Sequence, residues 1–353
     1  DTATFERILD GRLPDGSQVG DPATRYQGRD FTFSMPKSAS LLALVSGDKR
    51  ILEAHVAAVK DTMKWAEANL AEARIKVDGK DVAVRTGNLV YALFQHDTSR
   101  ATDPQSHIHA VIANLTQLPY RYRQSTRIDG RTGEAIRDDG WRAWHNPAMY
   151  RASTLLTSMT NANLRDRIEQ LGYTTEVTGE HGAFEVMGPN GERITAEALA
   201  GFSKRAADIR AKAEELGITS AEGRRAITQR TRDPKVDAGD RGELLARWRA
   251  EARTLGYNGD DIARAARDQV RERNGIERGA LAVGAAIRDA SAKLADVLQR
   301  PDDPLVDRGL ARLTMLPATA RTQYATASAI RILGEREVAF RIDDVVKTAL
   351  DLG

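Results

Sequence analysis

The stretch NLVYALFQHDTSRATDPQSHIHAVIANL, residues 88–115, decides how the rest of the chain is interpreted. It contains two apolar runs, NLVYALFQH and HIHAVIANL, separated by the polar link DTSRATDPQS at residues 97–106. Short apolar runs bounded by polar residues are typical of buried strands. The stretch therefore predicts two neighbouring strands, and antiparallel pairing across the link would bring their facing ends side by side.

Three of the six histidines of the chain fall in this stretch. Residues i and i+2 of a strand point to the same face, about 7 Å apart, so His107 and His109 lie side by side while Ile108 faces the opposite layer. His96 ends the preceding strand and would reach the same face. Neutral imidazole is the commonest protein ligand for divalent transition metals. Three such ligands leave coordination positions open, as a catalytic metal site requires.

A simpler interpretation competes with the metal site, because a histidine in a strand is usually an ordinary core or surface residue. The HxH pattern alone is a weak signal, and the third histidine on the neighbouring strand is what favours metal binding. The remaining histidines, His55, His145 and His181, are interpreted as ordinary helix, loop and turn residues. Metal-bound imidazole typically donates its second N–H to a carboxylate or carbonyl, and Asp30, at the start of a strand, is the candidate acceptor.

The composition excludes several classes of protein. Of the 353 residues, 41% are hydrophobic and 29% are charged, which suits a globular protein with a core. No apolar stretch approaches the roughly 20 residues of a membrane span, so no membrane insertion is expected. The absence of cysteine excludes disulfides and thiolate metal sites and fits a cytoplasmic location. Because the net charge is only +2, any binding of nucleic acid must come from local clusters.

The remaining patterns predict an α+β fold in which an antiparallel sheet is flanked by helices and followed by a helical region. Apolar residues alternate in GRDFTFS at residues 28–34, as in a strand, and recur at helical spacing at about residues 48–71. Residues 116–140 have no apolar period and predict a long loop or an inserted ribbon. The other expected elements are a helix at 4–10, hairpins at 74–87 and around GEHG, and a helix at about 150–171 that stops at Gly172.

From about residue 200 the sequence becomes almost wholly helical and rich in Ala, Arg and Glu. We expect residues 1–200 to form the sheet domain with the metal site. Residues 201–275 would form a helical region, and residues 276–353 a helical extension.

Taken in order, these motifs resemble the conjugative relaxases of the HUH endonuclease class, of the TraI/TrwC (MobF) type. The resemblance covers about residues 5–260, and the tail at 329–350 resembles the stretch that leads into a helicase. No GxxxxGK[ST] motif occurs, so no ATPase is expected. The stretches that carry the resemblance are DFTFSMPKS (30–38), GNLVYALFQHDTSR (87–100), DPQSHIHAVIANLT (103–116), WRAW (141–144), LRDRIEQLGYTTEV (164–177) and GFSKRAADI (201–209).

The resemblance implies an enzyme that nicks one DNA strand at a plasmid origin of transfer. A tyrosine hydroxyl attacks a phosphodiester and leaves a 5′-phosphotyrosyl adduct and a free 3′-OH. The resemblance makes His96, His107 and His109 the ligands of a divalent metal ion, Mg²⁺, Mn²⁺ or another transition metal. It also gives Asp30 a catalytic part, which is to orient a ligand histidine and help deprotonate the tyrosine. Ser106 departs from the apolar residue usual before the HxH pair, which affects packing and not ligation.

The family's nucleophilic tyrosine lies upstream of the RLPDG segment, which is residues 12–16 here. The chain opens DTATFERILD, without methionine, and is interpreted as a sequence entered partway through. Tyr26, Tyr91 and Tyr120 do not match the position of the nucleophile. We therefore interpret the sequence as a relaxase fragment with an intact metal site and without its nucleophile.

Contact with DNA requires clustered cations and stacking groups. Residues 203–236 carry nine Lys or Arg against five Asp or Glu, and the resemblance makes this region helical fingers that close over single-stranded DNA. A solvated helical face explains the same charges equally well. The run YRYRQSTR at 120–127 is likewise either a DNA-contacting ribbon or a charged surface loop. The candidate DNA contacts are Lys37, Arg100, Gln105, Tyr120, Arg121, Arg142, Lys204, Arg205, Arg224 and Arg225.

Two other functions compete with the relaxase. One is a replication-initiator nuclease of the same HUH class, and the other is a DNA-binding module without catalysis. The ordered similarity through the fingers favours the relaxase. By resemblance, its partners would be single-stranded origin-of-transfer DNA, relaxosome accessory proteins and a type IV secretion coupling protein.

Overall fold

The computed structural model describes residues 2–21, 23–77, 79–123, 126–128, 132–220, 223, 227 and 240–273. Its central element is a three-stranded antiparallel sheet in the order β1-β5-β4. The strands are β1 (Gly28–Ser34), β4 (Tyr91–Thr98) and β5 (Pro104–Ala113). The expected α+β class is confirmed, and the stretch that suggested it supplies the two strands β4 and β5.

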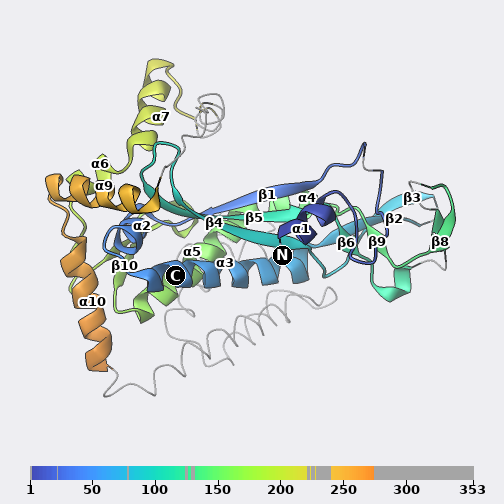
Figure 1. The fold of residues 1–353 in the computed structure, drawn as a ribbon, viewed down its shortest axis with the longest axis horizontal. Coiled ribbons are helices and arrows are strands. Elements are labelled where there is room, and N and C mark those ends of the chain that lie inside the picture. The colour runs from blue at the N-terminus through green and yellow to red at the C-terminus, as the bar shows by residue number, and fades with distance from the viewer. Residues whose placement is uncertain are drawn as a thin grey trace, which may run out of the picture.

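One face of this sheet is covered by two long helices, α3 (Lys49–Leu70) and α5 (Ser153–Gln170), which run along it in Figure 1. Ile108 and Ala110 of β5 pack there against Val59 and Met63 of α3. The other face of the sheet carries the residues of β5 that alternate with Ile108 and Ala110. Short helix α1 (Thr2–Leu9) covers one end of it, where Phe5 packs near Phe94 of β4 with ring centroids 6.3 Å apart.

Small ribbons lie beyond one end of the sheet, to the right in Figure 1. They include the expected hairpin at 74–87, formed by β2 (Glu72–Val77) and β3 (Lys80–Arg85). Of the two structures expected for residues 116–140, the described residues form the inserted ribbon and not the plain loop, because β6 pairs with β9 and β7 pairs with β8. The elements of this ribbon are β6 (Thr116–Gln117), the 3-10 turn η1 (Tyr120–Tyr122), β7 (Thr126–Ile128), β8 (Ala135–Arg137) and β9 (Trp141–Arg142).

A second apolar cluster lies at the opposite end and joins helices from distant parts of the sequence. Leu41 of α2 (Lys37–Leu44), Ile168 of α5 and Trp248 of α9 (Arg241–Thr254) all belong to it. Helix α9, beyond residue 200, therefore shares a core with the sheet domain. The other elements are α4 (Pro147–Arg151), β10 (Thr174–Val177), η2 (Glu180–Gly182), β11 (Phe184–Met187), α6 (Ala196–Gly201), α7 (Lys204–Glu215) and α10 (Gly259–Arg273).

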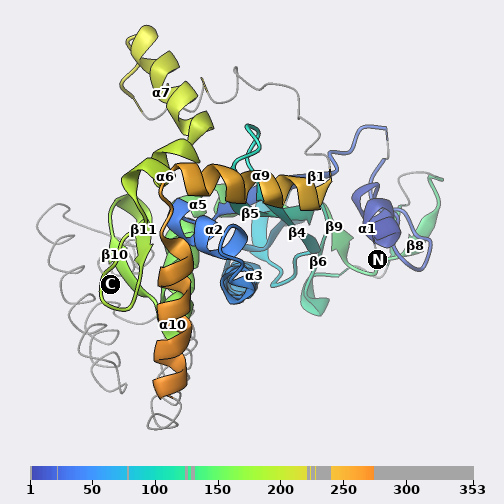
Figure 2. The ribbon, with the colours of Figure 1, turned by 60° about the vertical axis from the view of Figure 1, so that its left-hand side comes forward.

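Helix α7 stands away from this body in both views (Figures 1 and 2), whereas α9 lies across the end of the sheet. The proposed extension at 276–353 lies outside the described residues, and the division near residue 200 stays a prediction. None of the helices among the described residues is both long and apolar enough to cross a membrane.

Candidate metal centre

The three histidines of the opening stretch meet on the face of the sheet opposite α3. His96 of β4 stands directly across from His107 of β5, and His109 lies two residues further along β5. One ring nitrogen from each histidine lies within 4.8 Å of the other two. The ring centroids are 4.9 to 5.3 Å apart. In the described part of the chain, no other group of three His, Asp or Glu side chains converges in this way.

Asp30, the candidate acceptor, contacts His109. Its Oδ2 is 2.6 Å from Nδ1 of His109, and Oγ1 of Thr32 is 3.2 Å from the same nitrogen. Because a carboxylate oxygen accepts hydrogen bonds, this contact favours the neutral tautomer of His109 that carries its hydrogen on Nδ1 and has the lone pair on Nε2. The lone pair of Nε2 is what a metal ion would bind.

His107 is oriented by the backbone beside it. Its Nδ1 lies 3.1 Å from the carbonyl oxygen of Gln105, which again leaves Nε2 with the lone pair. The register between β4 and β5 shifts between His96 and Thr98, so a β-bulge lies beside the pair formed by His96 and His107. Burial lowers the pKa of His107, so at neutral pH the ring stays uncharged and able to bind a cation.

The backbone around this bulge is held from α2. The side-chain amide of Gln105 donates to the carbonyl of Met35 at 2.7 Å, and the backbone N–H of Ser106 donates to Oγ of Ser40 at 3.2 Å. Ser106, the departure from the family pattern, is fully buried. Sequence reasoning missed Ser40, although the serines of SMPKSAS were its available signal.

The donor set fits a metal ion. Three imidazoles from adjacent strands converge, and Nδ1 of His107 and of His109 is engaged in a hydrogen bond. Histidine nitrogens bind metals such as zinc at about 2.0–2.1 Å, and three ligands leave positions free for water or a substrate oxygen. The structure thus brings together all four residues expected at this site, and their ligand roles stay a prediction.

Several predicted DNA contacts are engaged within the protein. Nζ of Lys37 donates to the carbonyl of Pro104 at 3.1 Å, and burial lowers the pKa of this lysine to about 8. Nζ of Lys204 lies 2.6 Å from Glu251, and Arg142 pairs with the buried carboxylate of Asp138. With Gln105, these residues have structural roles that their sequence pattern did not indicate.

The other candidates differ in setting. Tyr120 is 86% exposed, and the guanidinium of Arg121 lies over the ring of Tyr122, 4.8 Å from its centroid. Arg100 is exposed and Arg205 is half-buried. Arg224 and Arg225 lie outside the described residues.

The three histidines given ordinary roles differ from one another. His55 of α3 is fully buried, and neither ring nitrogen has a hydrogen-bond partner. Burial, with a smaller contribution from a charge on His107, lowers its pKa to about 4. His181 lies in a turn with a φ of 59°, and His145 follows the buried Trp144.

Four tyrosines are packed or hydrogen-bonded at places other than the cluster of three histidines. The hydroxyl of Tyr26 is buried without a partner, and Tyr91 stands across from Ile112 on the face covered by α3. The hydroxyls of Tyr173 and Tyr257 contact Asp48 and Ser46, both at 2.8 Å.

Comparison with known proteins adds independent findings. A family model described as TrwC relaxase matches residues 1–255. The Multifunctional conjugation protein TraI of Escherichia coli is 36% identical over 355 residues, covering 98% of this chain. The corresponding TraI of strain K12 is 34% identical over the same share. The chain spans 17% of the length of each of these relatives.

Solved structures give the same result. The conjugative relaxase TrwC in complex with oriT DNA, in a copper-bound form, superposes with a TM-score of 0.60 at 36% identity, covering 73% of this chain and 83% of that chain. TrwC with a 27-mer DNA comprising the recognition hairpin and the cleavage site gives a TM-score of 0.60 at the same identity and covers 86% of that chain. A metal-free TrwC–oriT complex gives 0.61.

Proposed function

The chain belongs to the TrwC relaxase family, and on that premise we propose that it is the DNA-nicking region of a conjugative relaxase. It acts on one strand of origin-of-transfer DNA and transfers a phosphodiester to a tyrosine, forming a 5′-phosphotyrosyl intermediate. The observation that carries the proposal is the convergence of His96, His107 and His109, with Asp30 bonded to His109, on one face of a sheet. TrwC relaxases solved with oriT DNA support the same substrate.

His96, His107 and His109 would hold a divalent ion, for which we propose Mn²⁺ or Mg²⁺. When bound, such an ion polarises the scissile phosphate and neutralises charge that develops on its oxygens. Three protein ligands would leave coordination positions for those oxygens. Imidazole ligands favour transition metals over Mg²⁺, so Mn²⁺ is the better probe.

Asp30 has two parts in this mechanism. It favours the tautomer of His109 with the hydrogen on Nδ1, which would leave the lone pair of Nε2 for the ion. Because it is half exposed at the rim of the cluster, its carboxylate can also accept a proton from an attacking hydroxyl. We propose that the attacking tyrosine is none of Tyr26, Tyr173 and Tyr257, whose hydroxyls are buried or bonded elsewhere. We exclude Tyr91, which lies on the face covered by α3, and Tyr120 as well.

We propose the cytoplasm as the location. Relaxosome accessory proteins and a type IV secretion coupling protein are proposed as partners beyond the DNA. The two competing functions, an HUH replication initiator and a non-catalytic DNA-binding module, differ from the relaxase in substrate and in chemistry.

The proposed function is tested with the complete product of the gene and with the 353 residues. Each is mixed with 3′-labelled oligonucleotides tiled across the transfer origin of the replicon that encodes it, with Mn²⁺ or with a chelator. We expect the complete product to form an SDS-resistant adduct on one strand, with Mn²⁺ only. His107→Ala should abolish this adduct, while the control His181→Ala, in the turn η2 outside the cluster, should not.

Other outcomes identify the alternatives. An adduct at a replication origin would indicate an initiator, and binding without any adduct would indicate a non-catalytic module. The 353 residues are assayed in the same way. An SDS-resistant band from them would show that one of their own tyrosines is the nucleophile.

A further inference from the structure

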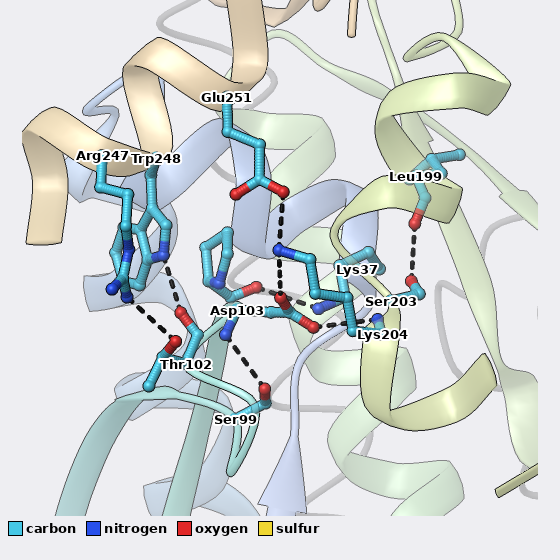
Figure 3. Close-up of polar contacts among 11 residues, drawn as sticks. Lys37, Ser99, Thr102, Asp103, Leu199, Ser203, Lys204, Arg247, Trp248 and Glu251 are labelled. Carbon is cyan, nitrogen blue, oxygen red and sulfur yellow. Dashed lines mark hydrogen bonds and ion pairs between the residues drawn. The ribbon is translucent and has the colours of Figure 1, made fainter. Parts of the chain in front are cut away.

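Residues 97–104 connect the two strands that carry the histidines, and we call them the turn; they include the end of β4 and the first residue of β5. Helix α7, which begins at Lys204, is bonded to this turn. Asp103 of this turn is only 2% exposed. Its Oδ2 accepts from the backbone N–H of Lys204, the first residue of α7, at 3.0 Å, and the Nζ of the same lysine lies 3.4 Å from Oδ1 (Figure 3). A carboxylate at a helix N-terminus satisfies a free N–H and complements the helix dipole. Asp103 therefore joins the turn to the start of α7.

Helix α9 holds the same turn from a second side. Trp248 is 1% exposed, and its Nε1–H donates to the carbonyl of Thr102 at 2.8 Å (Figure 3). Arg247 donates to Oγ1 of Thr102 at 2.9 Å, and Arg241 pairs with Asp97 at 2.6 Å. Thr102 has a φ of 58°, which a β-branched residue adopts only when its surroundings impose it.

The turn is also closed on itself and tied to α2. The backbone N–H of Asp103 donates to Oγ of Ser99 at 3.1 Å, and that of Thr102 donates to the carbonyl of Ser99 at 3.0 Å. Lys37 at the start of α2 donates to the carbonyl of Pro104. The turn thus has several fixed attachments and moves with the helices to which it is bonded.

His96 directly precedes this turn and His107 follows it by three residues. The two histidines stand directly across from each other, beside the shift in strand register. We propose that residues 97–104 transmit the placement of α7 and α9 to these two histidines, so that Asp103 and Trp248 are positioning residues for the metal centre. The inference rests on the proposed function in that the three histidines bind a metal ion.

The proposal has a thermodynamic consequence. If a ligand on α7 or α9 changes how these helices grip the turn, it changes the affinity for the metal ion, and the metal ion changes the affinity for that ligand by the same factor. The competing explanation is that the contacts only stabilise the fold. In that case the loss of one contact would lower the melting temperature without a selective effect on the histidines.

The test uses variants that each remove one contact. Trp248→Phe keeps a buried aromatic ring and removes the Nε1–H donor. Asp103→Ala removes the acceptor for α7, while the conservative Asp103→Asn retains an oxygen for the N–H of Lys204. Residues that orient metal ligands through a hydrogen bond typically contribute 10–100-fold to metal affinity. We expect Trp248→Phe and Asp103→Ala to weaken Mn²⁺ binding about tenfold by calorimetry, and Asp103→Asn to recover most of that loss.

Tyr173→Phe is the matched control, because it removes a buried hydrogen bond to Asp48 near the same apolar cluster without touching the turn. It should lower the melting temperature and leave Mn²⁺ affinity unchanged. If the turn variants bind Mn²⁺ with the affinity of the parent, or lose it only in proportion to the control, the proposal is overturned.

A second readout needs no metal. Amide hydrogen exchange of residues 96–107 is measured in metal-free protein, and we expect Trp248→Phe to speed exchange at His96 and His107 as well as in the turn. Unchanged exchange at these two histidines would overturn the inference. A parent protein that binds no Mn²⁺ would contradict the proposed function alone, and the exchange experiment would then decide this inference by itself.

Discussion

Two of the three clustered histidines have a defined tautomer because their Nδ1 atoms are engaged. The partner of His109 is a half-exposed carboxylate, Asp30, whereas the partner of His107 is the backbone carbonyl of Gln105. A side-chain partner can be removed by mutation without disturbing the chain, and a carbonyl cannot. Asp30 is therefore the residue through which the orientation of the site can be tested.

We predict that Asp30→Asn weakens Mn²⁺ binding by about 10–100-fold, the usual effect of losing such a partner. The asparagine keeps the size of the side chain and removes the negative charge that stabilises the hydrogen on Nδ1. Isothermal titration measures the change, and Asp61→Asn on α3 is the surface control. An unchanged Mn²⁺ affinity would mean that His109 is oriented without Asp30.

His55 is fully buried, and neither of its ring nitrogens has a hydrogen-bond partner. Its pKa is lowered from 6.5 to about 4, mainly by burial. The unfolded chain therefore binds a proton at this ring between about pH 6.5 and pH 4, where the folded chain does not. Stability rises with pH wherever the unfolded state binds more protons. The contribution is thus present above pH 6.5 and is lost as the pH falls towards 4.

We predict that the parent loses on the order of a few kcal/mol of unfolding free energy between pH 7 and pH 4 through this histidine. His55→Leu, which does not titrate, should lose correspondingly less over the same range. Urea unfolding at several pH values measures both proteins, with His181→Gln, a change at a half-buried turn residue, as the control. Parallel pH profiles for the parent and His55→Leu would contradict the prediction.

At the scale of elements, one glycine decides how α10 packs against the end of α5. Gly172 follows α5 with a φ of 95°, the left-handed conformation expected at a helix C-terminus. A Cβ at this position would lie 2.2 Å from the carbonyl oxygen of Ala266 in α10. The residue therefore meets two requirements, a positive φ and a close approach of backbone.

Gly172→Ala should destabilise the protein by about 2–5 kcal/mol, which combines the cost of a left-handed alanine with overpacking against a backbone atom. Gly47→Ala separates the two effects, because Gly47 has a φ of 74° but open space around it. Its expected cost is about 1–2 kcal/mol. Chemical unfolding compares the two, and equal losses would show that α10 shifts to accommodate the methyl group.

At the scale of the whole molecule, charge is balanced overall and uneven locally. The net charge is +2, whereas residues 203–236 carry nine basic and five acidic residues. Three of the basic residues predicted to contact DNA are bonded within the protein instead, namely Lys37, Lys204 and Arg142. The binding of a DNA strand must then depend more on the cations that remain.

We predict strongly salt-dependent binding of single-stranded DNA, with each phosphate contact contributing a slope of about −0.7. The double change Arg224→Glu and Arg225→Glu should make the slope of log affinity against log salt concentration shallower, by the equivalent of about two phosphate contacts. Reversing Arg264 and Arg271 on α10 alters the net charge equally and is the control for a purely global effect. Fluorescence anisotropy at several salt concentrations measures the slopes. Equal slopes in the two double variants, or equal affinity for duplex DNA, would favour a solvated helical face.

The sequence alone determined the local features of this protein, because these depend on near neighbours in the chain. Alternation placed His107 and His109 on one face of a strand, the polar link predicted the pairing that brings His96 to them, and Gly172 marked the end of a helix. Asp30 was singled out because a metal-bound imidazole would need an acceptor. Its contact with His109 is present, and its catalytic part stays a prediction.

Tertiary structure alone decided which polar side chains are turned inward, because the partner of a buried charge can lie far along the sequence. Lys204 and Asp103 are 101 residues apart, and Trp248 and Thr102 are 146 apart. In the sequence, Lys204 was one more cation in a basic stretch and Trp248 one more apolar residue in a helix. A charged or polar group loses its hydration when it is buried, so it needs a partner in space, and only the folded chain identifies that partner.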